Sequence, residues 1–199
     1  MPDKMPYEGA IEEAAKATSK ALELIKAASP AISDAYGLVI GDTIKHARAE
    51  RLERMAAKAK KKLIDRGVTQ PTQPPEQIAV PLLEVAQAES RDELIDLWAR
   101  LLANTMDPGR ISDVRAAYID ILKKLEPLDA KVLDFISKLN PANDQVTKHA
   151  AFERIGCRQS AAIVSIENLD ALGCVRLFGG NHFLTLSELG KEIVIAVQA

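Results

Sequence analysis

Aromatic side chains are scarce in this sequence: Phe, Tyr and Trp together make up 4% of its 199 residues, and there is a single Trp. Hydrophobic residues nevertheless make up 47% of the chain, which is enough to fill a core. That core must be built mainly from Ala, Leu, Ile and Val, a composition that favours packed helices. We therefore expect a mainly α protein with one large domain or two small ones.

Cysteine and histidine are also few, and their spacing fits no known site. Cys157 and Cys174 have no CxxC partner, which excludes a zinc pattern and a disulfide framework. His46, His149 and His182 are scattered, and the sequence has no P-loop, GxSxG or GxGxxG motif. Cys157 precedes a predicted helix whose dipole would favour a thiolate, but we favour its interpretation as a small residue near a helix start. The sequence thus predicts no catalytic residue, cofactor, metal or small-molecule substrate, and we do not expect an enzyme.

Long hydrophobic runs are missing too. A bilayer-spanning helix needs roughly 20 apolar residues, whereas the longest candidate here, AISDAYGLVIG, is short and contains Asp34. The N-terminal stretch MPDKMPYEGAIEEAAK is polar and acidic and lacks the apolar centre of a signal peptide. Together with the two unpaired cysteines, these features predict a cytoplasmic protein with reduced thiols. The net charge of −2 indicates that the chain as a whole does not bind nucleic acid through its charge.

Apolar residues at helical spacing predict two helices in the first third of the chain, over 8–28 and about 30–65. Gly67 is the expected stop of the second. Residues 68–79, VTQPTQPPEQIA, contain three prolines and three glutamines and predict a linker. We expect four parts: an N-terminal helical region with a long basic helix (1–67), the linker (68–79), a middle helical module (80–126) and a C-terminal module (127–199).

Three local motifs predict where the helices of the middle module begin. Pro81 is expected in the first turn of one helix. Ser90-x-x-Glu93 has the form of a capping box and predicts the start of a second helix, which ends at Asp107-Pro108. Ser112 is the expected cap of a third.

Trp98 lies on the second of these helices, at helical spacing from three leucines. We expect these side chains to anchor the core, and the alternative is a partner-binding groove or a dimer seam. The set is Trp98, Leu94, Leu101 and Leu102.

The C-terminal module changes character. Helical patterns over 127–139, 146–156 and 158–172 are followed by two short apolar strands around Gly179-Gly180, which predict a β-hairpin. Thr185-x-x-Glu188 has the form of a capping box opening the last helix. The order helix, helix, helix, hairpin, helix is that of a winged helix-turn-helix.

A winged helix would read DNA through the helix over 158–172. Residues 127–199, however, carry seven basic and eight acidic side chains, a balance of −1, whereas a DNA-reading module shows a clear basic footprint. We therefore favour a fold-stabilising or protein-contacting role. The residues that the DNA-binding alternative would use are Arg158, Gln159, Ser160, Ser165 and Asn168.

Residues 45–66 carry nine basic and three acidic side chains, a local charge of +6. Such a helix could contact nucleic-acid phosphates or anionic lipid headgroups, and it could equally be a solvated helix face. Phosphate contacts would position a nucleic acid without specifying its sequence. The candidate contacts with an anionic partner are Lys45, Arg48, Arg51, Arg54, Lys58, Lys61 and Lys62.

Three stretches in this order resemble the Abi-alpha (abortive infection alpha) family of bacteria: GDTIKHARAERLERMAAKAKKKLIDRGV (41–68), PPEQIAVPLLEVAQAESRDELIDLWARLLANTMDP (74–108) and AYIDILKKLEPLDAKVLDFI (117–136). The C-terminal FLTLSELGKEIV is also similar to the ending of such proteins. The resemblance implies a helical cytoplasmic protein of phage-defence type, and it brings no catalytic residue with it.

The preferred hypothesis is a non-enzymatic interaction protein in phage defence that acts through helix-mediated assembly with a protein partner or with itself. Two alternatives stay open. One is a DNA-binding regulator that uses the C-terminal winged helix, and the other is a peripheral membrane-surface protein that uses the basic helix over 31–66.

Overall fold

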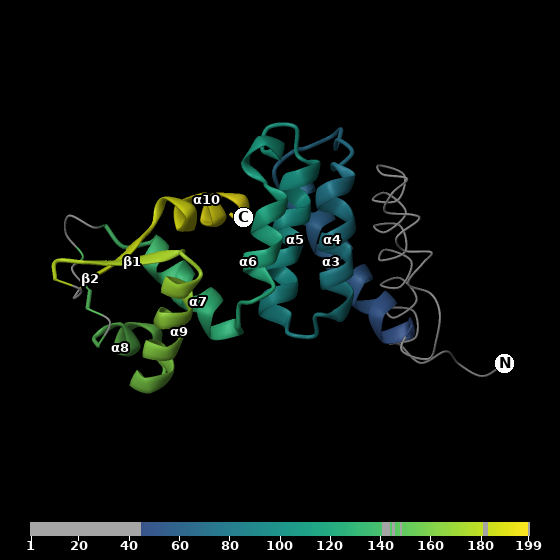
Figure 1. Cartoon of the computed structure of the whole chain (residues 1–199). Coiled ribbons are helices and arrows are strands. Elements are labelled where there is room, and N and C mark those ends of the chain that lie inside the picture. The colour runs from purple at the N-terminus through teal and green to yellow at the C-terminus, as the bar shows by residue number, and fades with distance from the viewer. Residues whose placement is uncertain (1–44, 141–143, 145, 148, 181–182, 199) are drawn as a thin grey trace. The chain divides into compact units, whose positions relative to one another are not determined.

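The structure is a computed structural model (Figure 1), and it describes residues 45–140, 144, 146, 147, 149–180 and 183–198. The chain divides into two compact units, unit 1 ending at Ala116 and unit 2 spanning Ala117–Gln198. The described residues are mainly helical, with a two-stranded antiparallel hairpin near the C-terminus, which confirms the predicted fold class. The predicted helix over 8–28 and the first part of that over 30–65 lie outside the described residues.

In the described part of unit 1, three helices pack on one another: α3 (Lys45–Asp65), α4 (Glu76–Ala88) and α5 (Asp92–Met106). A short 3-10 turn, η1 (Ile111–Asp113), packs on α5. The chain leaves α3 through Gly67, which has φ +73°, and the N–H of Val68 donates to the carbonyl of Leu63. This left-handed ending is the stop predicted at Gly67. The described core side chains of α3 are Leu52, Met55, Ala56, Ala59 and Leu63.

Helix α4 begins earlier than predicted. Its first residue is Glu76, so the end of the predicted linker is helical and Pro81 lies inside the helix. The carbonyl of Pro75 accepts hydrogen bonds from the N–H groups of Ile78 and Ala79, which starts the helix at this proline. Pro81 has no N–H to donate to the preceding turn, yet Leu82 and Leu83 are buried beside it, so burial of the apolar face offsets that loss.

The capping box predicted at Ser90-x-x-Glu93 and the cap predicted at Ser112 are both wrong. The residue before α5 is Arg91, and no side chain caps the helix there. Instead, the carboxylate of buried Glu89 accepts hydrogen bonds from the N–H groups of Ser90 and Arg91, each at 2.9 Å. Ser112 lies within η1, and α6 (Ala116–Leu122) begins beyond it. The Glu89 carboxylate thus fixes the turn that leads into α5, while the first turn of the helix itself has no side-chain cap.

Unit 2 contains α7 (Pro127–Ser137), α8 (Ala151–Ile155), α9 (Gln159–Ala171), β1 (Val175–Phe178), β2 (Phe183–Leu186) and α10 (Glu188–Ala196). The strands pair from Val175 opposite Leu186 to Phe178 opposite Phe183, and the second of these pairs brings the two rings to 5.5 Å between centroids. Helix α7 packs against α9, α10 and β2 (Figure 1). As predicted, α7 begins at Pro127 and the hairpin turns at Gly179-Gly180.

The start of α10 differs from the predicted capping box at Thr185, which lies on β2. Ser187 is the N-cap: its hydroxyl accepts from the N–H of Gly190 at 2.9 Å and donates to the carbonyl of Gly173. The N–H of Ser187 also donates to the carbonyl of Cys174 at 3.0 Å. One serine therefore joins the end of α9, the entry to β1 and the first turn of α10.

Gly190 allows this junction because its backbone lies against that of Cys174. A Cβ at position 190 would lie 1.8 Å from the carbonyl oxygen of Cys174, which is backbone and cannot move aside alone. We expect Gly190→Ala to lower the free energy of unfolding by at least about 2 kcal/mol, because overpacking forces the helix away from the strand. Thermal or urea denaturation followed by circular dichroism measures the loss.

Gly109→Ala is the matched control, since its Cβ would approach only the Asp107 carboxylate, at 3.4 Å. Equal stability of the Gly190→Ala variant and the wild type would contradict the role assigned to this contact.

Candidate interaction surfaces

The tryptophan cluster of α5 lies inside unit 1. Trp98 is 1% exposed, and Leu94, Leu101 and Leu102 are each at most 2% exposed. These four side chains are therefore part of the core of unit 1 and are not presented to solvent. This face of α5 contributes to folding, and any contact with a partner must use other residues.

The basic side chains of α3 face α5 in a regular row. Arg54, Lys58 and Lys62 are spaced four residues apart, so they lie on one face of the helix. Arg54 forms an ion pair with Asp92 at 2.9 Å, between Nη1 and Oδ1. The Nζ atoms of Lys58 and Lys62 lie 3.6 and 3.2 Å from Oδ1 of Asp96. We call this row the α3–α5 seam.

Asp96 is the centre of the seam because three cations share it. Besides the two lysines, Arg100 approaches its other oxygen with Nη2 at 2.8 Å. Burial by itself raises the pKa of the Asp96 carboxyl, but Arg100 and Lys62 outweigh it and hold the pKa below its ordinary value. Asp96 thus stays ionised, and the three cations around it leave a local positive excess.

Other basic residues of α3, and Arg66 directly after it, are also engaged within the chain. Arg51 donates to the carbonyl of Gln87 at 3.2 Å, and Lys61 pairs with Asp65 at 2.6 Å. Arg66 donates to the side-chain oxygen of Asn104 at 2.6 Å and lies 3.5 Å from Asp107. Arg48 is half-buried, and the side chain of Lys45 lies outside the described ones. Five of the seven predicted anion contacts therefore have a partner within the described part of the chain: Arg51, Arg54, Lys58, Lys61 and Lys62.

The predicted DNA contacts of α9 divide into two groups. Arg158, Gln159 and Ser160 are exposed at the start of the helix. Ser165 is buried, and its hydroxyl donates to Asp129 of α7, while the Asn168 amide donates to the same carboxylate at 2.7 Å. Both side chains are thus engaged by Asp129 within unit 2, which leaves Arg158, Gln159 and Ser160 as the exposed members of the predicted set.

Sequence reasoning missed the group that holds them. Asp129 also accepts a hydrogen bond from the N–H of Glu126 at 2.8 Å and completes a capping box with that residue around Pro127. The usual capping box begins with Ser or Thr, whereas this one begins with Glu126. The sequence signal was the pair Glu126 and Asp129, three residues apart, with Pro127 between them. Asp129 therefore fixes both the start of α7 and the position of α9.

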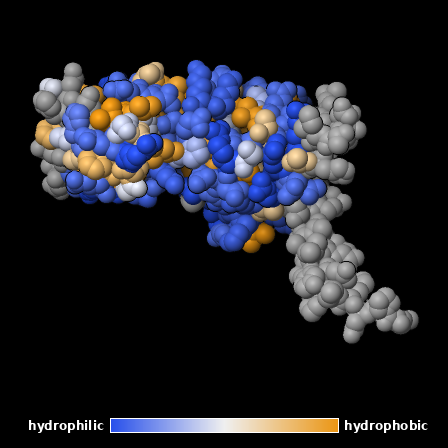
Figure 2. All heavy atoms as spheres, turned by 90° about the horizontal axis from the view of Figure 1, so that it is seen from below, coloured by the Kyte–Doolittle hydropathy of each residue, from blue (hydrophilic) through white to orange (hydrophobic). Residues whose placement is uncertain are grey.

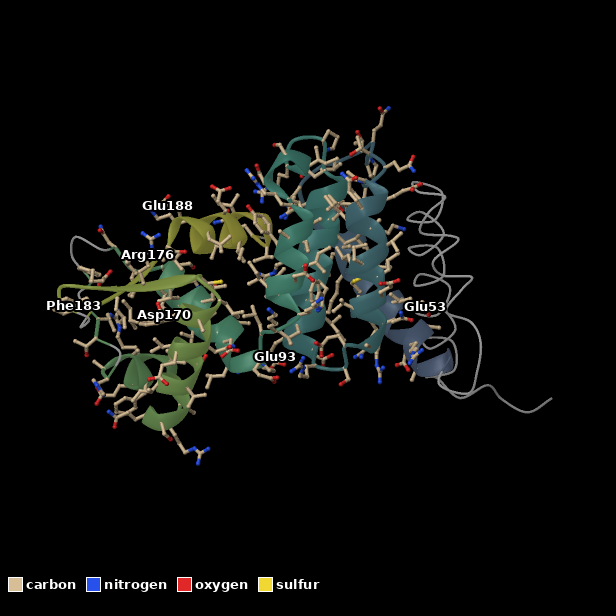
Figure 3. All side chains as sticks on the ribbon, in the orientation of Figure 1. Glu53, Glu93, Asp170, Arg176, Phe183 and Glu188 are labelled. Atoms are coloured by element: carbon tan, nitrogen blue, oxygen red, sulfur yellow. The ribbon has the colours of Figure 1, made fainter. Side chains whose placement is uncertain are left out.

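The outward face of α9 is short of cations. Its exposed residues recur at helical spacing as Ser160, Val164, Glu167 and Ala171, and exposed Asp170 lies next to them (Figure 3). Such a face combines an apolar side chain with carboxylates, which would repel phosphates but suits contact with another protein.

The two cysteines differ in their burial. Cys174 is buried, and burial raises the pKa of its thiol to about 11, so it is protonated at neutral pH. Cys157 is half-buried before α9. Within the described part of the chain, no three His, Cys, Asp or Glu side chains are grouped so that they could hold a metal ion. None of the described helices combines the length and apolarity required to cross a bilayer.

The geometry of the seam predicts that Asp96→Asn lowers the free energy of unfolding at neutral pH. Three cations would then meet without a carboxylate, at a cost on the order of 1 kcal/mol after allowance for solvent screening. Because the folded pKa of Asp96 is lowered, its contribution is present above the unfolded pKa and is lost as pH falls through the folded one. Denaturation curves between neutral pH and about pH 3 should therefore converge for wild type and variant.

The exposed i,i+4 pair Asp134–Lys138 supplies the control, and Asp134→Asn should change stability little at any of these pH values. A gap between wild type and Asp96→Asn that is the same at every pH would argue against this assignment.

The family model described as abortive infection alpha matches residues 47–194 of the chain, a range that takes in parts of both units. No curated protein and no solved structure matches it.

Proposed function

The chain belongs to the abortive infection alpha family, and from this membership we propose that it acts in phage defence. We propose further that it acts there as a non-enzymatic interaction protein, through helix-mediated contacts with a protein partner or with further copies of itself. The family description supports the first part, and the surfaces of the two units support the second.

The exposed face of α9 carries the interaction proposal. Val164 is 66% exposed there, with Glu167 one helical turn away. An exposed aliphatic side chain flanked by carboxylates favours a protein partner over a polyanion, because phosphates would meet like charge. In the fold, α9 is the element that a DNA-reading winged helix would place in the major groove.

The two alternatives have weaker support. A DNA-binding regulator would need cations along α9, where only Arg158 stands at the start of the helix and two of the five candidate contacts are turned inward. A membrane-surface protein would need a free basic face on α3, whose cations are largely paired across the seam and within the helix. The observation that favours an anionic partner is the local positive charge around Asp96, where three cations share one carboxylate.

Infection assays test the proposal directly. Bacteria that express the chain should give a lower yield of at least one phage in a broad panel than cells with an empty vector. Trp98→Ala should abolish this protection, because loss of a fully buried Trp costs about 3–5 kcal/mol of stability. Asp134→Asn, an exposed substitution in unit 2, should keep it.

Unchanged phage yield across the panel, with soluble chain present, would remove the phage-defence proposal. A salt-sensitive affinity for duplex DNA or flotation with anionic vesicles would instead favour one of the alternatives.

A further inference from the structure

Two large aliphatic side chains stand out of the described surface. Val164 on α9 is 66% exposed and Ile64 on α3 is 62% exposed, well above the 37% of Leu189 and Ile195. On the face shown in Figure 2, hydrophobic residues form small separate groups within a mainly hydrophilic surface. The residues that surround Val164 and Ile64 therefore determine what kind of partner each side chain could bind.

Ile64 borders a groove at the end of α3. The groove has a volume of about 370 Å³ and is lined mainly by apolar groups from the last turn of α3 and the segment that follows it. Lys60, one turn before Ile64, contributes the charged group of its wall. Lys61 is paired with Asp65, so Lys60 is the cation that remains available to an incoming carboxylate. The lining residues are Lys60, Leu63, Ile64, Gly67, Val68, Thr69 and Pro71.

Val164 has the opposite surroundings. Glu167 lies three residues further along α9 and is exposed on the same side, and exposed Asp170 follows it (Figure 3). No ion pair is found for Glu167 or Asp170 among the described residues, whereas Asp92, Asp96 and Asp107 of unit 1 are each held by cations. This end of α9 therefore presents an aliphatic side chain beside unpaired negative charge.

We propose that the two surfaces bind each other between copies of this chain: Val164 of one copy enters the groove beside Ile64 of the next, and Glu167 pairs with Lys60. A second copy is the occupant favoured by the observations, because the chain itself carries both an apolar groove with a cation and an apolar knob with an anion. This inference rests on the proposed function and specifies the contact through which assembly occurs.

The contact is heterologous, since each copy contributes a different surface at each end. Every copy bound through its groove still has its Val164 surface open, so assembly continues into a ring or a filament instead of stopping at a dimer. One helix face against one groove is a small interface, and small interfaces bind weakly. Assembly is therefore steeply dependent on protein concentration, and its charged component weakens in salt.

Sedimentation velocity of the full chain, from low micromolar to the highest soluble concentration, should show species larger than a dimer. Ile64→Ser and Val164→Ser should each be monomeric, with the association constant lowered at least about tenfold. An equimolar mixture of the two should form a 1:1 dimer and nothing larger. In that mixture, the Ile64→Ser copy still supplies Val164, and the Val164→Ser copy still supplies the groove.

Charge exchange examines the ionic half of the contact. Lys60→Glu and Glu167→Lys should each weaken assembly severalfold, because each variant by itself places like charges at the contact. An equimolar mixture of the two should assemble again, because the groove of either variant then meets opposite charge beside Val164 of the other. The double variant Lys60→Glu/Glu167→Lys restores the pair in reversed polarity and should therefore assemble like the wild type. Ile195→Ser and Glu84→Lys, both at exposed positions elsewhere, are the matched controls and should assemble normally.

A wild type that stays monomeric at every concentration overturns the inference, as do single variants that assemble normally or a serine mixture that yields no dimer. Circular dichroism of each variant guards against loss of fold. The infection assay is read separately: protection by a chain that never assembles would refute this contact and leave the defence role standing, whereas assembly without protection would do the reverse.

Discussion

The close packing of α3 on α5 is the constraint on which unit 1 depends. With so few aromatic side chains, the interior has to be closed by bringing helix backbones near one another, and both helices bury alanines for this purpose. Ala56 and Ala59 on α3 and Ala99 and Ala103 on α5 are at most 1% exposed. Helices α3 and α5 pack closely on each other, and their charged side chains lie within ion-pairing distance along the α3–α5 seam.

Unit 2 depends on two buried polar side chains that each link several elements through hydrogen bonds. Asp129 joins the first turn of α7 to the buried side of α9, and Ser187 joins the end of α9 to the first turn of α10. A buried carboxylate or hydroxyl is tolerated only when its hydrogen bonds are made, and here each makes several. Ser165 and Asn168, which were candidates for DNA contacts, therefore use their side chains in hydrogen bonds within unit 2.

What remains for a partner is a small set of surfaces. Much of the positive charge of α3 is directed at α5, and α9 shows an aliphatic side chain among carboxylates where a DNA reader would show cations. Membership of the abortive infection alpha family gives these surfaces a biological setting. Assembly through Ile64 and Val164 would let a protein of this kind act by bringing copies together, without requiring chemistry at a catalytic centre.

The sequence by itself determined the mainly helical class, the stop at Gly67, the start of α7 at Pro127 and the hairpin at Gly179-Gly180, because periodicity, proline and glycine act locally on the backbone. It misplaced the starts of α4, α5 and α10, because the packed chain decides where each helix begins: no side chain caps α4 or α5, whereas Ser187 caps α10. The partners of Lys58, Lys62, Ser165 and Asn168 were likewise decided by the tertiary structure alone. Each of them pairs with a carboxylate more than 30 residues away in sequence, and no local pattern carries that information.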